Sequence, residues 1–381
     1  MRPTMITRLR RQWYLRLGLR EVFGAAAAVV VLASLLGCDK GTGPKPAPKY
    51  LLYAAMVAPQ GQANGFIAVI DCETDSIIDS VKNLSEHPGV VASPDGKYLA
   101  AISAGSPPLI IDAVNRTRIK SLAAPGLLPL FLPDAGILVY PDFDSTCVYS
   151  VPEFVVKEVW PRPRFVVEHG PGKGHLATIE RRGDNLRDRS KLVIFEYLNY
   201  RAVDSVVIDP DAQDVGFQIM NFTFSPDGAR LYATGGQRGF GSGVVGYDLR
   251  TRETLFRQSL YGPFGYCRVT PDGREVWVTD PGYPIEDSPG WPQTIFIFDA
   301  VAGTLLDTVS IRNISPSSAE PLAAQDIRFV PDGSKAYVNC GSFFKGNQPI
   351  LVISTRTRRV DRLIFGGFED RAVMIDIAQY P

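Results

Sequence analysis

Ser225-Pro226-Asp227-Gly228 lies between two short apolar runs, and this four-residue pattern returns along the chain. Proline fixes the first turn dihedral, aspartate bonds the local backbone and glycine accepts the positive φ that closes a hairpin. The copies are Ser93-Pro94-Asp95-Gly96, Leu132-Pro133-Asp134, Thr270-Pro271-Asp272-Gly273 and Val330-Pro331-Asp332-Gly333. Their aspartates lie 39, 93, 45 and 60 residues apart, and a degraded copy at residues 170–174 divides the longest gap. A unit of about 40 to 60 residues is typical of propeller-type repeats.

Each unit reads as four short strands. After the hairpin comes a second apolar run that ends in aspartate, such as Val244-Val245-Gly246-Tyr247-Asp248, and a third apolar stretch follows a polar turn. No helical periodicity interrupts these runs. Six full units span residues 89–125, 126–163, 164–216, 217–262, 263–322 and 323–369.

The two ends of the repeat region complement each other. Residues 50–88 supply three strands, and residues 371–378 supply one apolar strand with no hairpin partner after it. Joining them removes unpaired sheet edges, which otherwise invite aggregation. We therefore expect an all-β chain, a single seven-bladed β-propeller of four-stranded blades over residues 50–381, with the first blade closed by the N- and C-terminal strands.

The repeat resembles a known family, the bacterial YVTN-type β-propeller repeat, a relative of the surface-layer and lactonase-like propellers. The resemblance covers about residues 50–381 and is good in Ser93–Asp112, Ser225–Asp248, Thr270–Asp299 and Val330–Ser354. It fails in the third and fourth units, where the turn is altered. Because the shared residues are turn formers and core strands, the resemblance implies the fold and says little about function.

The first 37 residues read as a lipoprotein signal peptide. A leader with six arginines precedes an apolar core at residues 22–36, and Leu35-Leu36-Gly37-Cys38 matches a lipobox in which Cys38 takes the lipid. The apolar core is short for a transmembrane helix; a membrane anchor with an incidental cysteine is the alternative. Residues 38–49 then form a stiff Pro/Gly/Lys tether. We expect a lipid-anchored protein of the cell envelope, on its periplasmic or extracellular face.

Charge gives no reason to expect nucleic acid as a partner. The whole chain has 40 basic and 40 acidic residues, and without residues 1–37 the balance is 34 to 39, a net charge of −5. Nucleic-acid binding needs a basic surface. We expect a monomer that contacts the membrane through its lipid alone, and no cofactor.

Cysteine and histidine usage predicts no metal site. Cys72, Cys147, Cys267 and Cys340 fall in four different units, so free buried thiols are favoured over a disulfide framework or zinc site, with a bridge still open in an oxidising compartment. His87 belongs to the opposite end of the fold from His169 and His175, which read as ordinary turn residues. The glycine-rich stretch 235–243 precedes a strand rather than a helix, so it is not a phosphate loop. No catalytic residue is predicted.

The longest insertions are predicted to share one face of the ring. They are residues 180–191, 235–243, 280–293 and 341–349 within blades, with 209–218 and 312–325 between blades. Long loops on a rigid scaffold tend to carry binding sites. The aromatic residues expected to form a partner-binding patch there are Phe240, Tyr283, Trp291, Phe343 and Phe344. In the alternative, these side chains fold back and cover the blades beneath.

The entrance to the central channel is a second candidate site. Aligning the units on their hairpins brings together polar residues near the starts of the innermost strands, namely His87, Arg164, Asn221, Tyr266, Asp326 and Arg371. An aspartate between two arginines and a histidine is expected to stay ionised, which suits an anion or a small polar molecule. A hydrated polar plug is the alternative.

Two functions of different classes fit these features. The first is a non-enzymatic, lipid-anchored scaffold that presents its loops and channel mouth to an unknown protein, glycan or small polar ligand. The second is a lactonase-like or other hydrolase, for which the family resemblance implies a metal, or a histidine with carboxylates, at the channel mouth. The candidates for that role are His87, Asp326 and Asn221. We favour the scaffold because no dense group of histidines and carboxylates is present.

Overall fold

The fold is taken from a computed structural model. Residues Pro48–Pro381 form one compact unit. The structure describes residues 49–57, 65–84, 88–103, 106–122, 129–132, 136–141, 145–161, 167–170, 174–181, 190–196, 201–207, 218–237, 241–260, 265–279, 293–311, 314, 323–341, 349–364 and 371–379. Within these ranges, no helix is long and apolar enough to span a membrane.

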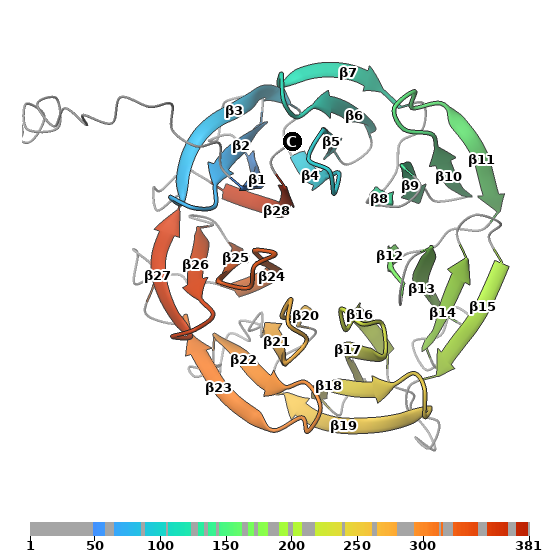
Figure 1. Cartoon of the computed structure of the whole chain (residues 1–381), viewed down its shortest axis with the longest axis vertical. Helices are drawn as coiled ribbons and strands as arrows, with labels where there is room; N and C mark the ends of the chain where they lie inside the picture. Colours follow the sequence, from blue (N-terminus) through green and yellow to red (C-terminus); the bar gives the residue numbers. More distant parts are fainter. Residues whose placement is uncertain are drawn as a thin grey trace, which may run out of the picture. The chain divides into compact units, whose positions relative to one another are not determined.

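The described strands form seven four-stranded antiparallel sheets, arranged as blades around a central axis (Figure 1). From the axis outward, blades one to four are β28 (Arg371–Gln379), β1 (Tyr50–Val57), β2 (Gly65–Asp71) and β3 (Ser76–Leu84); β4 (Pro88–Ala92), β5 (Tyr98–Ser103), β6 (Ser106–Asp112) and β7 (Thr117–Ser121); β8 (Leu130–Leu132), β9 (Ile137–Pro141), β10 (Ser145–Tyr149) and β11 (Val156–Pro161); and β12 (Val167–His169), β13 (His175–Arg181), β14 (Ser190–Glu196) and β15 (Arg201–Val207). Blades five to seven are β16 (Gln218–Phe224), β17 (Arg230–Gln237), β18 (Gly241–Asp248) and β19 (Glu253–Leu260); β20 (Cys267–Val269), β21 (Glu275–Thr279), β22 (Thr294–Asp299) and β23 (Leu305–Ser310); and β24 (Ala323–Phe329), β25 (Lys335–Gly341), β26 (Ile350–Ser354) and β27 (Arg359–Ile364).

Blade one takes its innermost strand from the other end of the chain. Strand β28 pairs antiparallel with β1, with Leu52 opposite Ile377 and Ala54 opposite Ile375. The other six sheets each use four consecutive strands. Blade one is therefore the sheet in which the two ends of the repeat region meet.

The inner hairpins are built by the turn chemistry of the repeated motif. In blade five, the Gly228 N–H donates to the Ser225 carbonyl (2.8 Å), while Asp227 accepts from the Ser225 hydroxyl and the Ala229 N–H. Gly228 has φ +67°, a region that glycine enters without steric penalty. The two altered turns also contain a glycine with positive φ, Gly136 and Gly174. The third and fourth units thus keep this element of the turn although their sequences differ.

The hydrophobic core lies between neighbouring blades. Alternate residues of β1 point to opposite faces, so Leu51 and Tyr53 pack against blade two while Leu52 and Ala54 pack against blade seven. The outermost strands are different: every described side chain of β7 is exposed, and Ile77 and Leu305 are 51% and 53% exposed. The third apolar stretch of each unit is thus an outer edge strand rather than core.

A buried aromatic residue recurs in the second strand of four blades, as the fourth residue of β1 and the third residue of β17, β21 and β25. Tyr53 of β1, Tyr232 of β17, Trp277 of β21 and Tyr337 of β25 are all fully buried. The Tyr232 hydroxyl donates to the Ala300 carbonyl of the next blade (2.6 Å), and the Tyr337 hydroxyl donates to Asp75 of blade one (2.6 Å). These side chains therefore fill the space between blades, and the hydroxyls of Tyr232 and Tyr337 hydrogen-bond across it.

Candidate functional site

Many of the residues predicted to form the site lie outside the described residues. These are His87, Arg164 and the five aromatics Phe240, Tyr283, Trp291, Phe343 and Phe344. The longest insertions also fall largely in such segments. Arg371 is the first residue of β28.

Asn221 and Tyr266 lie on or beside inner strands of adjacent blades. Asn221, in β16, is 7% exposed, and its Oδ1 accepts a hydrogen bond from the Cys267 N–H (3.0 Å). That bond connects blades five and six. Tyr266 directly precedes β20 and is 42% exposed, and its N–H donates to the Thr279 hydroxyl (2.9 Å).

Asp326 is the predicted residue around which a cluster forms. It lies in β24, and its two carboxylate oxygens face guanidinium groups of Arg268 (3.3 Å) and Arg328 (3.1 Å). Arg268 belongs to β20 of the preceding blade, so the first pair crosses a blade junction. The arginines predicted beside this aspartate were Arg164 and Arg371, whereas the arginines that contact it are Arg268 and Arg328.

Asp376, which the sequence analysis also missed, extends the cluster into blade one. The Arg328 Nε lies 3.7 Å from Asp376 and donates to the neighbouring Ile375 carbonyl (3.3 Å). The second Asp376 oxygen accepts the Ala92 N–H of β4 (2.8 Å). Burial raises the pKa of Asp376 above its usual range, against the opposing influence of Arg328 and of backbone N–H donors. One carboxylate thereby connects blades seven, one and two.

We call Arg268, Asp326, Arg328 and Asp376 the inner arc. Their strands, β20, β24 and β28, lie side by side around the axis (Figure 1). The four side chains are between 12% and 26% exposed, so solvent reaches them although they are mostly enclosed. The two guanidinium groups balance the two carboxyl groups when both are ionised. Held in place by mutual ion pairs, these groups form a preorganised polar surface of donors and acceptors on the inner strands.

A register argument could have found the inner arc. Arg268 and Arg328 each lie two residues before the first residue of a hairpin motif, Thr270 and Val330, and Asp326 lies two residues earlier still. Alternate residues of a strand share a face, so all three point to the same side of their sheets. Asp376 occupies in β28 the position that Arg328 occupies in β24. The next residue, Ile377, pairs with β1 in the same way that Phe329, the residue after Arg328, pairs with β25. Blade one has no hairpin motif after that strand, so this signal was absent from the sequence.

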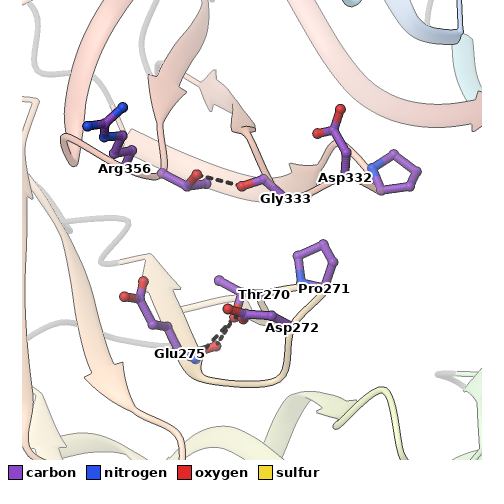
Figure 2. A pocket seen from close by; sticks show the side chains of 9 residues that line it. Thr270, Pro271, Asp272, Glu275, Asp332, Gly333 and Arg356 are labelled. Carbon is purple, nitrogen blue, oxygen red and sulfur yellow. Dashed lines mark hydrogen bonds between the residues drawn. The ribbon is translucent and has the colours of Figure 1, made fainter.

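A separate pocket lies between the inner hairpins of blades six and seven (Figure 2). Its volume is about 380 Å³, and it is lined by Thr270, Pro271, Asp272, Glu275, Pro331, Asp332, Gly333, Thr355 and Arg356. The Thr355 hydroxyl donates to the Gly333 carbonyl, and Glu275 is held by Arg358 (2.6 Å) and by the Trp277 indole N–H (2.9 Å). A hydrogen bond from the Ser334 hydroxyl lowers the pKa of Asp332. Because these polar groups hydrogen-bond to one another, within a blade and between blades six and seven, the pocket is part of the junction between these two blades.

The predicted thiols and turn histidines have the following environments. Cys72, Cys147, Cys267 and Cys340 are free and buried, although Cys72 lies in the turn after β2 rather than on a strand. His169 ends β12 and His175 begins β13, on either side of the altered hairpin. In the part of the chain that the structure describes, no three histidine, cysteine or acidic side chains are grouped to hold a metal ion.

Comparison with known proteins supports the fold. No family model matches the chain, and no curated protein matches it. Among solved structures, hydrazine synthase of Kuenenia stuttgartiensis is similar with a TM-score of 0.59 and 14% identity, over 84% of this chain and 99% of that one. The β-propeller domain of Cps50 (Swd1) from Myceliophteria thermophila gives 0.54 and 15%, over 74% and 87%. Dihydro-heme d1 dehydrogenase NirN, in complex with DHE, gives 0.55 and 13%, over 86% and 74%.

At these identities the likeness concerns architecture alone. The ring of four-stranded sheets and the structural neighbours together show that the chain is a β-propeller. The closer assignment to YVTN-type repeats stays a prediction from the sequence motif.

Proposed function

We propose that this chain is an exported, lipid-anchored β-propeller that acts as a non-enzymatic binding scaffold. The inner arc is the observation that carries the proposal, because it is a set of fixed, partly exposed polar groups on the inner strands. We assign it a small polar ligand that bears both hydrogen-bond donors and acceptors, since the arc presents guanidinium and carboxyl groups together. The loops of the predicted crown are assigned to a protein or glycan partner.

The chemistry of the arc favours binding over catalysis. Both oxygens of Asp326 face a guanidinium group. A general base needs a lone pair directed at a substrate proton. An aspartate held in this way instead orients two arginines, and arginine provides a planar set of donors suited to carboxylate or phosphate groups.

Ligand binding is testable with two variants and a matched control. The full chain, purified in mild detergent, would be screened by thermal shift against a panel of carboxylates, phosphates, amines and sugars. Hits would then be measured by calorimetry in the wild type, Asp326→Asn and Arg328→Gln. Asp332→Asn serves as the control because Asp332 is an exposed carboxylate of an inner hairpin. We expect the two arc variants to weaken binding at least tenfold and the control to leave it unchanged; unchanged affinity in both arc variants contradicts the assignment.

Export and lipidation need a separate experiment. Metabolic labelling with an alkyne-tagged fatty acid should modify the wild-type chain and Cys340→Ala, but not Cys38→Ala. Cell fractionation should move the Cys38→Ala variant from the membrane to the soluble envelope fraction. Label retained by Cys38→Ala would disprove the lipobox assignment without bearing on the inner arc.

A further inference from the structure

A repeated pair of positions lies at each junction between blades, near the outer strands. In six blades the turn between the third and fourth strands contains a residue with positive φ, which we call the turn residue. These are Asp75, Arg116, Phe154, Arg252, Gly303 and Arg358 in blades one, two, three, five, six and seven. The residue four positions later, on the outermost strand, is the edge residue. The edge residues are Asp79, Lys120, Glu158, Phe256, Asp307 and Arg362 in those six blades. In blade four, whose turn lies outside the described residues, the edge residue is Asp204, because it pairs with Ile194 as Asp79 pairs with Val69.

Where the structure describes both sides of a junction, the edge residue of one blade contacts the turn of the next; at the junction of blades two and three, the Lys120 ammonium donates to the Glu153 carbonyl (3.5 Å). At three junctions the pair is an aspartate with an arginine: Asp79 with Arg116 (2.8 Å), Asp204 with Arg252 (2.7 Å) and Asp307 with Arg358 (3.6 Å). The three turns are in equivalent positions and so are the three carboxylates. The same ion pair therefore recurs between blades one and two, four and five, and six and seven.

The junction between blades five and six uses shape instead of charge. Its edge residue is Phe256 and its turn residue is Gly303, and a Cβ atom at Gly303 would overlap the Phe256 ring. The Gln258 amide also donates to the Gly303 carbonyl (3.0 Å). The other five turn residues all have side chains. A side chain at the position of Gly303 would occupy the space that the aromatic ring of Phe256 fills.

The junction between blades seven and one reverses the polarity. Its edge residue is Arg362, which donates to the Thr74 carbonyl (3.0 Å), and its turn residue is Asp75. Asp75 accepts two bonds from the Lys335 ammonium (2.9 and 3.0 Å) and one from the Tyr337 hydroxyl. At the three ion-paired junctions, the acid belongs to the earlier blade and the base to the later one. At the junction between blades seven and one, which completes the ring, the base belongs to the earlier blade and the acid to the later one.

We infer that the polarity of these contacts reserves blade one for blade seven, because the acidic turn of blade one meets basic side chains of blade seven, whereas the three ion-paired junctions place the acid on the earlier blade. Placing blade one after blade six would set Asp307 beside Asp75, two carboxylates. Placing blade two or blade five after blade seven would set Arg362 beside another arginine. Because repeated blades share strand patterns and could pair out of order, repulsion between mismatched neighbours supplies the discrimination that apolar packing lacks. Surface ion pairs add little stability by themselves, so the effect of a mismatch is expected mainly in the yield of correctly assembled monomer.

Charge exchange at the junction of blades four and five tests this inference. The full chain would be unfolded in urea, diluted, and the monomer fraction measured by size exclusion with light scattering. Asp204→Arg and Arg252→Asp each create like charges at their own junction, and Arg252→Asp also creates an acidic turn suited to Arg362. We expect each single variant to lower the recovered monomer at least threefold, and the double variant to recover it to within twofold of wild type.

Two controls separate mismatch from simple loss of a contact. Arg201→Asp reverses a charge on the same outer strand, but Arg201 pairs with Glu196 of its own blade (3.2 Å), so monomer recovery should not change. Arg252→Asn removes the ion pair without introducing a like charge, and asparagine tolerates positive φ, so recovery should stay near wild type. The inference is overturned if the single reversals refold like wild type, if the double variant recovers no better than the single ones, or if Arg252→Asn loses as much monomer as Arg252→Asp.

Discussion

The Tyr337 hydroxyl donates a 2.6 Å hydrogen bond to Asp75, across a sequence separation of 262 residues. Tyr337 belongs to the last blade and Asp75 to the first. Its equivalent in blade five, Tyr232, donates to a neutral backbone carbonyl instead. The junction that completes the ring therefore contains the more strongly polar version of a repeated contact.

This difference predicts unequal effects of removing the two hydroxyls. Hydrogen bonds to charged groups contribute more than those between neutral groups. Tyr337→Phe should lower the free energy of unfolding by about 2 kcal/mol and Tyr232→Phe by about 1 kcal/mol. Urea unfolding of both variants measures the difference, and equal losses would show that the charge of Asp75 adds nothing.

The inner strand of blade one should be essential for the stability of the ring. Ile375 and Ala378 are buried, and Asp376 bonds to blades two and seven. Deleting residues 371–381 removes these contacts and exposes the edge of β1. At about 25 cal/mol per Å² of apolar surface, the loss of one buried strand is on the order of several kcal/mol. An unchanged melting temperature after this truncation would contradict the pairing of β28 with β1.

Asp376 should make stability fall as pH rises. Because its pKa is raised in the folded state, the folded chain retains this proton at pH values at which the unfolded chain releases it. Stability therefore decreases from the unfolded pKa, near 4, up through the raised folded value. Asparagine does not titrate, so Asp376→Asn lacks this pH dependence. The difference in the free energy of unfolding, wild type minus variant, should therefore decrease as pH rises across this window. Urea titrations at several pH values measure it, and a constant difference would exclude the shift.

Steric fit at the junction of blades five and six can be separated from backbone strain. Gly303 and Gly333 both have positive φ, +65° and +75°, but the nearest neighbour atom to a Cβ at Gly333 is 3.9 Å away. Gly333→Ala should therefore lose about 1 kcal/mol from backbone strain alone. Gly303→Ala should lose about 2 kcal/mol more, because its methyl group overlaps Phe256. Similar losses in the two variants would mean that Phe256 moves aside easily.

The thiols should be unreactive in the folded chain. Cys72 and Cys340 are 4% and 0% exposed, and burial raises the pKa of Cys72 to about 12 and also raises the pKa of Cys340. The thiolate is the reactive form. Ellman's reagent at pH 8 should thus label neither residue until urea is added. Rapid labelling of the native chain at Cys72 or Cys340 would contradict their burial.

The fold was readable from the sequence because its strongest signals are local. Asp227 and Gly228 form their turn with neighbours in the same hairpin, so their spacing reports the repeat directly. The inner arc depends instead on the register of strands from different blades. Asp326 was identified from its position before a hairpin, whereas Arg268 and Asp376 meet Asp326 and Arg328 only once neighbouring sheets are placed around the axis. The junction pairs were missed for a related reason: Arg252 and Asp204 lie 48 residues apart, and nothing local indicates their contact.

The pairing of β28 with β1 also has a consequence for biosynthesis. Chains fold from the N-terminus as they are made, yet the first blade lacks its inner strand until the last segment of the ring emerges. Until then, the inner edge of β1 has no partner strand. The ring therefore cannot close until residues 371–379 are available to pair with β1, and a polypeptide that ends before them leaves this edge unpaired.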